Sequence, residues 1–482
     1  MTEIELLIGG VSRPSLNGAQ FERLNPISQQ PVTRAAAATV DDADAAVAAA
    51  ANAFPAWAAL GPGERRARLM RAAQLLEEKA PEFMALGVAE IGGAAGWYGF
   101  NVKLAADMIR EAASMTTQIG GEVIPSNVPG SLAMALRQPA GVVLGIAPWN
   151  APIILGVRAL AMPLACGNTV VLKASEVCPA THRLIGTVFQ EAGLGDGVVN
   201  VLTNAPQDAA VIVERLIANR AVRRVNFTGS TAVGRIVGEL AARHLKPTLL
   251  ELGGKAPMVI LEDADLGEAV KAAAFGAFFN QGQICMSTER IIVHESVADE
   301  FVARLAKKAA TLPAGDPTQP GFVLASMVGT TAAAKVAALI EDAVAKGAAL
   351  SGGATDGSIA QPAVLDRVSS SMNIYSTESF GPVVAVIRVK DDKEAVRVAN
   401  DTEYGLSASI FSRDVSRALN IAGQIRSGIC HINGPTVHDE AQMPFGGVGA
   451  SGYGRFGGKA AIAEFTDLRW ITIQNSPRHY PI

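Results

Sequence analysis

The feature that most constrains the fold is a regular alternation of short β-branched runs and amphipathic helical stretches between residues 141 and 252. The strand-like runs are GVVLGIAP, NTVVLKAS, GVVNVLT, VRRVNFTG and PTLLELGG, and a helical pattern separates each from the next. Alternation at this spacing predicts a parallel, doubly wound α/β sheet. Such sheets bind ligands at the carboxyl ends of their strands.

The flanking segments predict further units. The first 120 residues are expected to be mainly helical, with a helix cap at Thr39 and a break at Pro81. A second α/β region is expected over about 255–445, and a terminal strand near 465–474 that pairs with another sheet or subunit. A chain of 482 residues is long enough for two or three such units.

The charge and the apolar runs exclude several classes of partner. A net charge of −4 without a dense basic run argues against nucleic acid and against an anionic membrane surface. The longest apolar tract, 141–157, is interrupted by Pro148 and Pro152, so a membrane-spanning helix is not expected. The N-terminus has no visible secretory pattern.

The cysteines and histidines predict neither a disulfide framework nor a catalytic metal. The four cysteines are too widely spaced for a zinc knuckle and fit reduced thiols in the cytoplasm. Three of them, Cys166, Cys178 and Cys430, are expected to be buried structural thiols. Three histidines, His294, His431 and His438, have no metal-ligand spacing.

Two strand ends have residues suited to a dinucleotide. Gly229 and Ser230 open a helix directly after a strand, where backbone amides suit a pyrophosphate, although a plain strand-to-helix turn fits the pattern equally well. Lys173 and Glu176 follow another strand and could reach a ribose, or could be an exposed loop pair. A carboxylate there would bond a free 2′-hydroxyl and repel a 2′-phosphate.

Other polar residues suit acyl chemistry. Glu251 ends a strand before two glycines, where a carboxylate can act as a base or only form a solvated turn. Asn150 in APWN has an amide that can donate to an oxyanion. Cys285 follows the stretch NQGQI and is either a small core residue or a nucleophile. Glu378 and Phe380 precede another strand.

Taken in order, these motifs resemble those of the aldehyde dehydrogenase superfamily along essentially the whole chain. The matching segments are APWN, LKASE, FTGSTAVG, LELGGKAP, GQICMSTER, ESFGP and PFGGVGASGYGRFGG. The separation of 34 residues between Glu251 and Cys285 also matches (285 − 251). An enzyme is therefore expected, with a catalytically silent relative acting as a binding protein as the alternative from another class.

The resemblance implies a role for each matching residue. Cys285 would be the nucleophile that forms a thiohemiacetal and then a thioester, Asn150 would hold the oxyanion, and Glu251 would be the general base for hydrolysis. Relatives that transfer the acyl group to coenzyme A generally lack this glutamate. The cofactor would be NAD, with NADP a poorer alternative, and its expected contacts are Ala147, Pro148, Trp149, Lys173, Glu176, Gly229, Ser230, Glu378 and Phe380.

A narrower likeness points to the substrate. Residues 96–131 and 431–447 and the closing RHYPI are similar to the bacterial branch of the family that oxidises vanillin to vanillate. Members acting on salicylaldehyde or on benzaldehydes in general are the alternative. The expected substrate contacts are Trp97, Phe100, Asn101, Arg158, Ile284, Met286, Phe445 and Tyr453.

One position departs from the family pattern. Arg158 and Ala159 stand where many members have an aromatic residue followed by lysine. Arg158 is expected to donate near Cys285 or to an oxygen on an aromatic ring, or else to form a salt bridge within the helical packing.

The resemblance also implies the architecture. A Rossmann-like NAD-binding domain would comprise 1–122, 141–252 and 446–463, and an α/β catalytic domain 253–445. A bridging β element, 123–140 with 464–482, would join a partner subunit in a homodimer or homotetramer.

Overall fold

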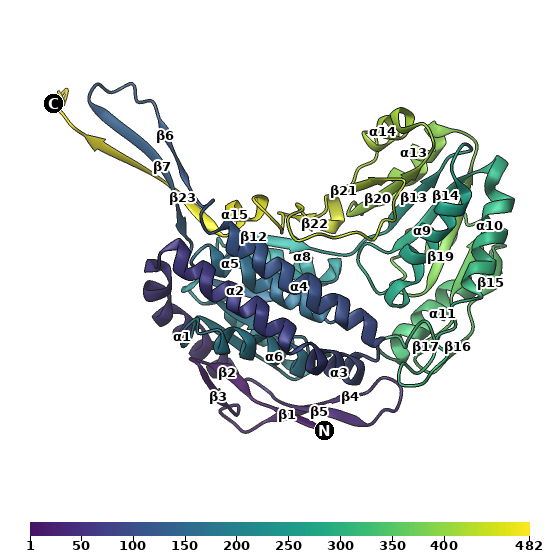
Figure 1. Cartoon of the computed structure of the whole chain (residues 1–482), viewed down its shortest axis with the longest axis horizontal. Helices are drawn as coiled ribbons and strands as arrows, with labels where there is room; N and C mark the ends of the chain where they lie inside the picture. Colours follow the sequence, from purple (N-terminus) through teal and green to yellow (C-terminus); the bar gives the residue numbers. More distant parts are fainter.

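The computed structural model describes residues 1–482 and is built on two large β-sheets and a smaller one that projects from the body (Figure 1). The first large sheet has eight strands in the order β22-β12-β11-β8-β9-β10-β2-β3. Its five central strands are mutually parallel. The bounds are Gly452–Tyr453 (β22), Thr248–Glu251 (β12), Val222–Thr228 (β11), Val142–Ile146 (β8), Thr169–Lys173 (β9), Val199–Leu202 (β10), Leu6–Ile8 (β2) and Val11–Arg13 (β3).

The strand order of this sheet explains where its ligand site lies. The chain runs from β8 outward through β9 and β10, and then returns to add β11 and β12 on the other side of β8. The order reverses between β8 and β11, and such a switch point opens a crevice at the carboxyl ends of the strands. The connecting helices are Pro152–Ala165 (α5), Pro179–Glu191 (α6), Ala209–Ala218 (α7, preceded by the 3₁₀ turn Pro206–Asp208) and Thr231–Arg243 (α8). The predicted alternation is confirmed.

The N-terminal segment differs in part from its prediction. Strands occupy much of the first 36 residues, and the helices begin only at Val40. These strands are at most six residues long and several are partly exposed, so they have little of the apolar signature that identifies a strand. Thr39 caps the first helix in a capping box, and Pro81 lies in the first turn of the third, as expected. The elements are Thr2–Ile4 (β1), Gln20–Leu24 (β4), Pro31–Ala36 (β5), Val40–Ala59 (α1), Pro62–Glu78 (α2), Ala80–Ile91 (α3) and Ala95–Met115 (α4).

The second large sheet has seven strands in the order β15-β18-β19-β14-β13-β20-β21. Its strands are Ala349–Gly352 (β15), Ala363–Asp366 (β18), Val383–Val389 (β19), Thr288–His294 (β14), Ala256–Ile260 (β13), Ser407–Phe411 (β20) and Ile429–Ile432 (β21). The helices of this part are Leu266–Phe278 (α9), Glu295–Ala309 (α10), Thr330–Ala345 (α11), Asn373–Ser376 (α12), Asp392–Asn400 (α13) and Val415–Ala422 (α14), and a two-stranded hairpin pairs Thr355–Asp356 (β16) with Ile359–Ala360 (β17).

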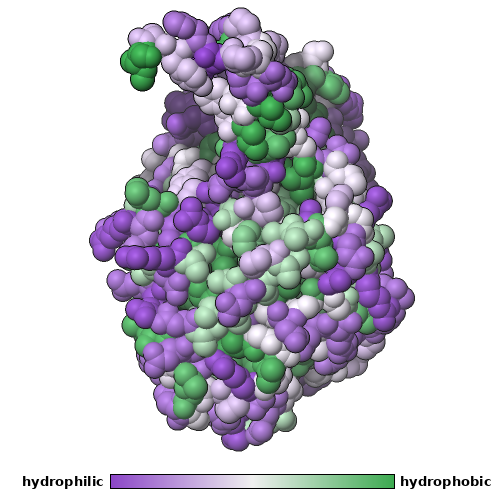
Figure 2. All heavy atoms as spheres, turned by 90° about the vertical axis from the view of Figure 1, so that its left-hand side faces the viewer, coloured by the Kyte–Doolittle hydropathy of each residue, from purple (hydrophilic) through white to green (hydrophobic).

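The projecting sheet contains β6 (Gly121–Ile124), β7 (Ser131–Pro139) and β23 (Thr466–Gln474), all antiparallel and in the order β23-β7-β6. The short helix α15 (Ala460–Glu464) leads into it. It extends from the body beside α5 and ends in the C-terminus (Figure 1). Figure 2 views the molecule from this end and shows apolar atoms on the projecting sheet. In this sheet Val123, Leu468 and Trp470 expose 70%, 62% and 76% of their surface.

One structural thiol was predicted wrongly. Cys430 is exposed, because it lies on β21, which is the edge strand of the second sheet. Cys166 and Cys178 are buried as expected. Among the helices, none combines the length and apolarity needed to cross a lipid bilayer.

Candidate active site

The strand ends of the first sheet and a loop of the second sheet line one cavity of about 260 Å³. The loops after β8, β11 and β12 line it from one side, and the turn before β14 and the loop before β19 line it from the other. Most of the predicted catalytic and cofactor residues lie on its wall: Pro148, Trp149, Asn150, Gly229, Ser230, Glu251, Cys285, Glu378 and Phe380. Ala147, Lys173 and Glu176 lie outside this lining.

The turn that leads to Cys285 has an unusual backbone. Asn280, Gln281 and Gly282 have φ values of 48°, 56° and 69°, in the left-handed region that residues other than glycine rarely adopt. The side chain of Asn280 donates to the carbonyl oxygen of Asn150 at 3.1 Å, which ties this turn to the first sheet. Cys285 is therefore held by tertiary contacts at the boundary between the two sheets.

The Cys285 thiol is not pre-ionised in this setting. Burial and the neighbouring Glu251 carboxylate raise its pKa well above the usual value, while the charge of Arg158 opposes them. A thiol of this kind needs a base beside it before it can act as a nucleophile.

Glu251 has the properties of such a base. It ends β12 and is buried, and neither carboxylate oxygen has a hydrogen-bond partner of normal geometry. Burial raises its pKa to about 7, against the opposing effects of Arg158 and of a hydrogen bond with Cys285. The close packing needs the glycines after Glu251, since a Cβ on Gly254 would lie 2.4 Å from the Cys285 carbonyl oxygen.

Hydrogen bonds hold both the side chain and the backbone of Asn150 in place. Its Nδ2 donates to the carbonyl oxygen of Gln283 at 3.1 Å, and its own carbonyl oxygen accepts from Trp97 Nε1 at 3.0 Å. The amide therefore lies against the Cys285 turn with a second N–H proton available to an oxyanion.

The predicted pyrophosphate position is a helix start. Ser230 caps α8, and its side-chain oxygen accepts from the backbone N–H of Val233 at 3.4 Å. The other first-turn N–H groups of α8 point away from the helix body, and this geometry fits an anionic group. At the end of strand β9, on the other side of β8, Lys173 pairs with Glu176, which also accepts from Asn204 Nδ2 at 3.0 Å.

The loop that bears Glu378 and Phe380 is held by a buried ion pair that the motifs did not single out. Glu289 accepts from the backbone N–H groups of Ser379 and Phe380, both at 3.0 Å, and from Lys255 Nζ at 2.6 Å. A signal existed, because both charged residues belong to the motifs GQICMSTER and LELGGKAP, with Glu289 in the buried strand β14 and Lys255 directly before the buried strand β13.

These contacts orient the two loop side chains. Glu378 accepts from the Gly254 N–H at 2.8 Å, and burial raises its pKa to about 7. Phe380, at a φ of 50°, meets Trp149 edge to face at 5.8 Å between ring centroids.

An aromatic cluster lies beside Asn150. Trp97 and Phe100, one turn apart on α4, stack with ring centroids 5.7 Å apart, and Phe279 meets Trp97 edge to face at 5.1 Å. Phe275 stacks on Phe279 at 4.9 Å. Phe275 and Phe279 are not among the predicted substrate residues, although both belong to the run AFGAFFNQG just before the Cys285 turn.

The remaining predicted substrate residues have different environments. Ile284 and Met286 are both buried beside Cys285. Asn101 is buried and donates to the Trp97 carbonyl oxygen at 2.9 Å within α4. Tyr453 lies elsewhere: it is half exposed on β22, and its hydroxyl bonds Thr248 at 2.7 Å.

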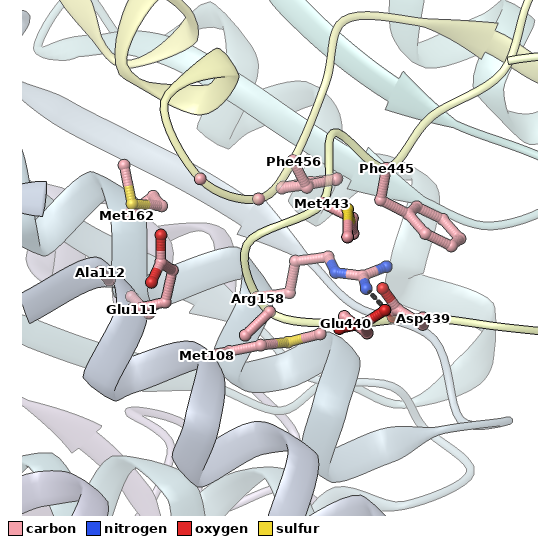
Figure 3. A pocket seen from close by; sticks show the side chains of 14 residues that line it. Met108, Glu111, Ala112, Arg158, Met162, Asp439, Glu440, Met443, Phe445 and Phe456 are labelled. Atoms are coloured by element: carbon pink, nitrogen blue, oxygen red, sulfur yellow. Dashed lines mark hydrogen bonds and ion pairs between the residues drawn. The ribbon is translucent and has the colours of Figure 1, made fainter. Parts of the chain in front are cut away.

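Arg158 forms a buried ion pair with Asp439 (Figure 3). Its guanidinium carbon lies 4.3 Å from the centre of the Phe445 ring and 5.6 Å from that of Phe456. Of the two outcomes expected for Arg158, the salt bridge is thus present. Asp439 was missed because its partner lies 281 residues away in the chain.

The chain is similar to known proteins along its length. The model of the aldehyde dehydrogenase family matches residues 14–471. A vanillin dehydrogenase of Pseudomonas fluorescens is 68% identical over 483 residues, covering 100% of both chains. A salicylaldehyde dehydrogenase of Pseudomonas putida is 49% identical, covering 99% of both. The crystal structure of a salicylaldehyde dehydrogenase from Pseudomonas putida G7 complexed with salicylaldehyde superposes with a TM-score of 0.98, at 48% identity and full coverage of both chains.

Proposed function

The chain belongs to the aldehyde dehydrogenase family, and from this membership we propose that it oxidises aromatic aldehydes, vanillin foremost, to carboxylates with NAD as the acceptor. The observation that carries the proposal is the convergence of a thiol, a carboxylate and a side-chain amide on one cavity. An aromatic cluster lies directly behind that amide. The full-length similarity to vanillin dehydrogenases supports the choice of substrate.

The first step is covalent. Glu251 takes the proton of the Cys285 thiol, and the thiolate attacks the aldehyde carbon to form a thiohemiacetal. Asn150 Nδ2 and the Cys285 backbone N–H donate to the oxygen as it becomes negative. Removing one such donor typically costs roughly 2.7–4 kcal/mol of transition-state stabilisation.

The second step releases the acid. A nicotinamide cofactor held by Glu378 and the start of α8 would supply the acceptor for the hydride that leaves the carbon attached to Cys285 Sγ, so that a thioester remains on the sulfur. Glu251 then takes a proton from water, which attacks the thioester and frees the carboxylate and the thiol. Its pKa of about 7 suits this task, because the base form is present at neutral pH and the proton can be released again.

The residues at the strand ends fit a dinucleotide. The start of α8 would hold the pyrophosphate, and Glu378 the nicotinamide ribose. The Lys173–Glu176 pair would meet the adenosine ribose, where the carboxylate favours NAD over NADP. In the test, Glu176→Gln raises kcat/KM with NADP relative to NAD, and an unchanged ratio contradicts this assignment.

A panel of aldehydes tests the substrate class. The proposal expects higher kcat/KM for substituted benzaldehydes than for short aliphatic aldehydes, with NAD preferred. The alternative is a salicylaldehyde or general benzaldehyde dehydrogenase, and the TM-score of 0.98 to a relative complexed with salicylaldehyde favours it. Salicylaldehyde or benzaldehyde as the best substrate would support this alternative.

A catalytically silent protein is the alternative from another class. The presence of Cys285, Glu251 and Asn150 in one cavity supports an enzyme. Alkylation of the thiols followed by NADH absorbance distinguishes the two cases, because only an enzyme loses NADH formation on alkylation.

The architecture supports a proposal for assembly. We divide the chain into an NAD-binding domain (1–122, 141–252, 446–463), a catalytic domain (253–445) and a bridging element (123–140, 464–482). The bridging element leaves exposed apolar residues on β23, and the second sheet leaves β21 as an open edge. Unpaired edges favour strand addition, so we propose a homodimer or homotetramer joined there. Four free thiols fit a cytoplasmic enzyme.

A further inference from the structure

Asp439 is a buried carboxylate that the catalytic steps do not use. Its side chain is 9% exposed, and only one of its oxygens, Oδ2, bonds Arg158. The other oxygen, Oδ1, is buried and has no hydrogen-bond partner in the chain. A buried carboxylate oxygen without a partner is costly, so such an atom is expected to meet a donor that arrives from outside the chain.

Asp439 borders a cavity, although its side chain is largely covered. It lines a cavity of about 470 Å³ between α4 and the segment 439–442, and Phe100 lines the same cavity. It also lines the adjoining small pocket with Arg158 and Phe445 (Figure 3).

A continuous wall leads from this cavity to the reacting groups. Phe100 stacks on Trp97, and Trp97 donates to the carbonyl oxygen of Asn150, whose side chain lines the catalytic cavity. Asp439 is also near enough to Glu251 for the charge of one to affect the other. An aromatic aldehyde that lies along this wall, with its carbonyl carbon at Cys285, would point the far side of its ring toward Asp439.

We propose that Asp439 is a specificity-determining residue: its free Oδ1 accepts a hydrogen bond from a hydroxyl on the ring of the substrate, distal to the aldehyde. The inference rests on the proposed function and names the substrate class more closely, as hydroxylated benzaldehydes. The same carboxylate neutralises Arg158, so a carboxylate on the ring meets repulsion from Asp439 instead of a free guanidinium.

The test compares matched substrates on the intact enzyme. The probes are 4-hydroxybenzaldehyde, which can donate, 4-methoxybenzaldehyde, which cannot, and 4-carboxybenzaldehyde, which is charged. A hydrogen bond to an ionised acceptor predicts that the wild type prefers the hydroxyl over the methoxy compound in kcat/KM by roughly 10- to 100-fold.

Asp439→Asn should change these ratios in opposite directions. The hydroxyl-to-methoxy ratio falls toward one, mainly through KM, because the amide can donate to either oxygen. The kcat/KM for 4-carboxybenzaldehyde rises relative to benzaldehyde, because Arg158 is no longer neutralised. A merely damaged fold cannot produce this gain. The matched control is Glu239→Gln on the exposed part of α8, which removes one negative charge away from this cavity and keeps both ratios at wild-type values.

Three outcomes would overturn the inference: a wild-type ratio near one, equal losses on the hydroxyl and methoxy compounds in Asp439→Asn, or the same shifts in Glu239→Gln. Salicylaldehyde tests the position of the hydroxyl, because its hydroxyl lies next to the aldehyde. Its kcat/KM relative to benzaldehyde should not change in Asp439→Asn. A change as large as that of 4-hydroxybenzaldehyde also contradicts the proposal. Failure of the proposed function looks different, because the wild type would then oxidise none of the benzaldehydes.

Discussion

At the scale of single residues, the protonation of Glu251 governs the pH dependence of turnover. Its carboxyl has a pKa of about 7, so it stays protonated, and inactive as a base, at lower pH. The charges that act on it are those of Arg158, Asp439 and Glu378, and the Cys285 thiol lies beside it. We expect kcat to rise as the pH increases from about 6 to 8, as the general base becomes ionised.

Replacing this base tests both of its roles, the ionisation of Cys285 and the hydrolysis of the thioester. Glu251→Gln should lower steady-state kcat by about 100- to 10,000-fold, the usual contribution of a general base. Because Glu251 also takes the thiol proton, rapid mixing should show slower formation of NADH in the first turnover. Any thioester that does form would then accumulate, because its hydrolysis has lost the base. Glu239→Gln, on the exposed part of α8, is the control and should keep parental kinetics. Full steady-state activity in Glu251→Gln would contradict the role of Glu251.

At the scale of elements, the start of α8 is expected to serve both stability and cofactor binding. Ser230→Ala removes the cap and should lower the free energy of unfolding by about 1 kcal/mol, while raising KM for NAD. Asp414→Ala removes the cap of α14, away from the cavity, and should lower stability similarly without changing KM. Thermal melts measure the loss of stability, and NAD titrations measure KM for NAD. If Ser230→Ala and Asp414→Ala have the same KM for NAD, the start of α8 does not bind the pyrophosphate.

Trp97 on α4 links the aromatic cluster to Asn150, and two substitutions separate these roles. Trp97→Phe keeps an aromatic wall but loses the 3.0 Å hydrogen bond to the Asn150 carbonyl oxygen, so kcat should fall for all aldehydes. Trp97→Ala also removes the wall and should raise KM for vanillin far more than for a short aliphatic aldehyde. Steady-state kinetics with both substrates test this. Equal KM changes for the two aldehydes in Trp97→Ala would show that the ring does not bind the substrate.

Some elements of the fold can be predicted from the sequence, and some contacts between elements cannot. The strands and helices from β8 to β12 follow from local periodicity, and the order of motifs indicates the family. The Lys255–Glu289 and Arg158–Asp439 pairs do not follow, because each joins segments that are distant in the chain, by 34 and 281 residues. Strands such as β1 and β4 are too short and too exposed to produce a clear pattern.

At the scale of the whole molecule, the projecting sheet predicts assembly. Trp470 on β23 is 76% exposed, and a glutamate there would place a charge in any interface that covers it. Trp470→Glu should therefore shift the protein toward monomers in light scattering coupled to size-exclusion chromatography. The control is Val11→Glu on β3, the edge strand of the first sheet. Val11 is 59% exposed, and its replacement should leave the molecular mass of the assembly unchanged. A monomeric wild type would contradict the proposed assembly.

The central claim is that Cys285 carries the substrate as a covalent acyl group, and peptide mass spectrometry tests it most directly. Glu251→Gln would be mixed with NAD and vanillin, quenched in acid and digested. The account predicts the mass of the aroyl group on the peptide containing Cys285 and none on Cys430, the exposed thiol. Formation of NADH without any adduct, or an adduct on Cys430 alone, would contradict it.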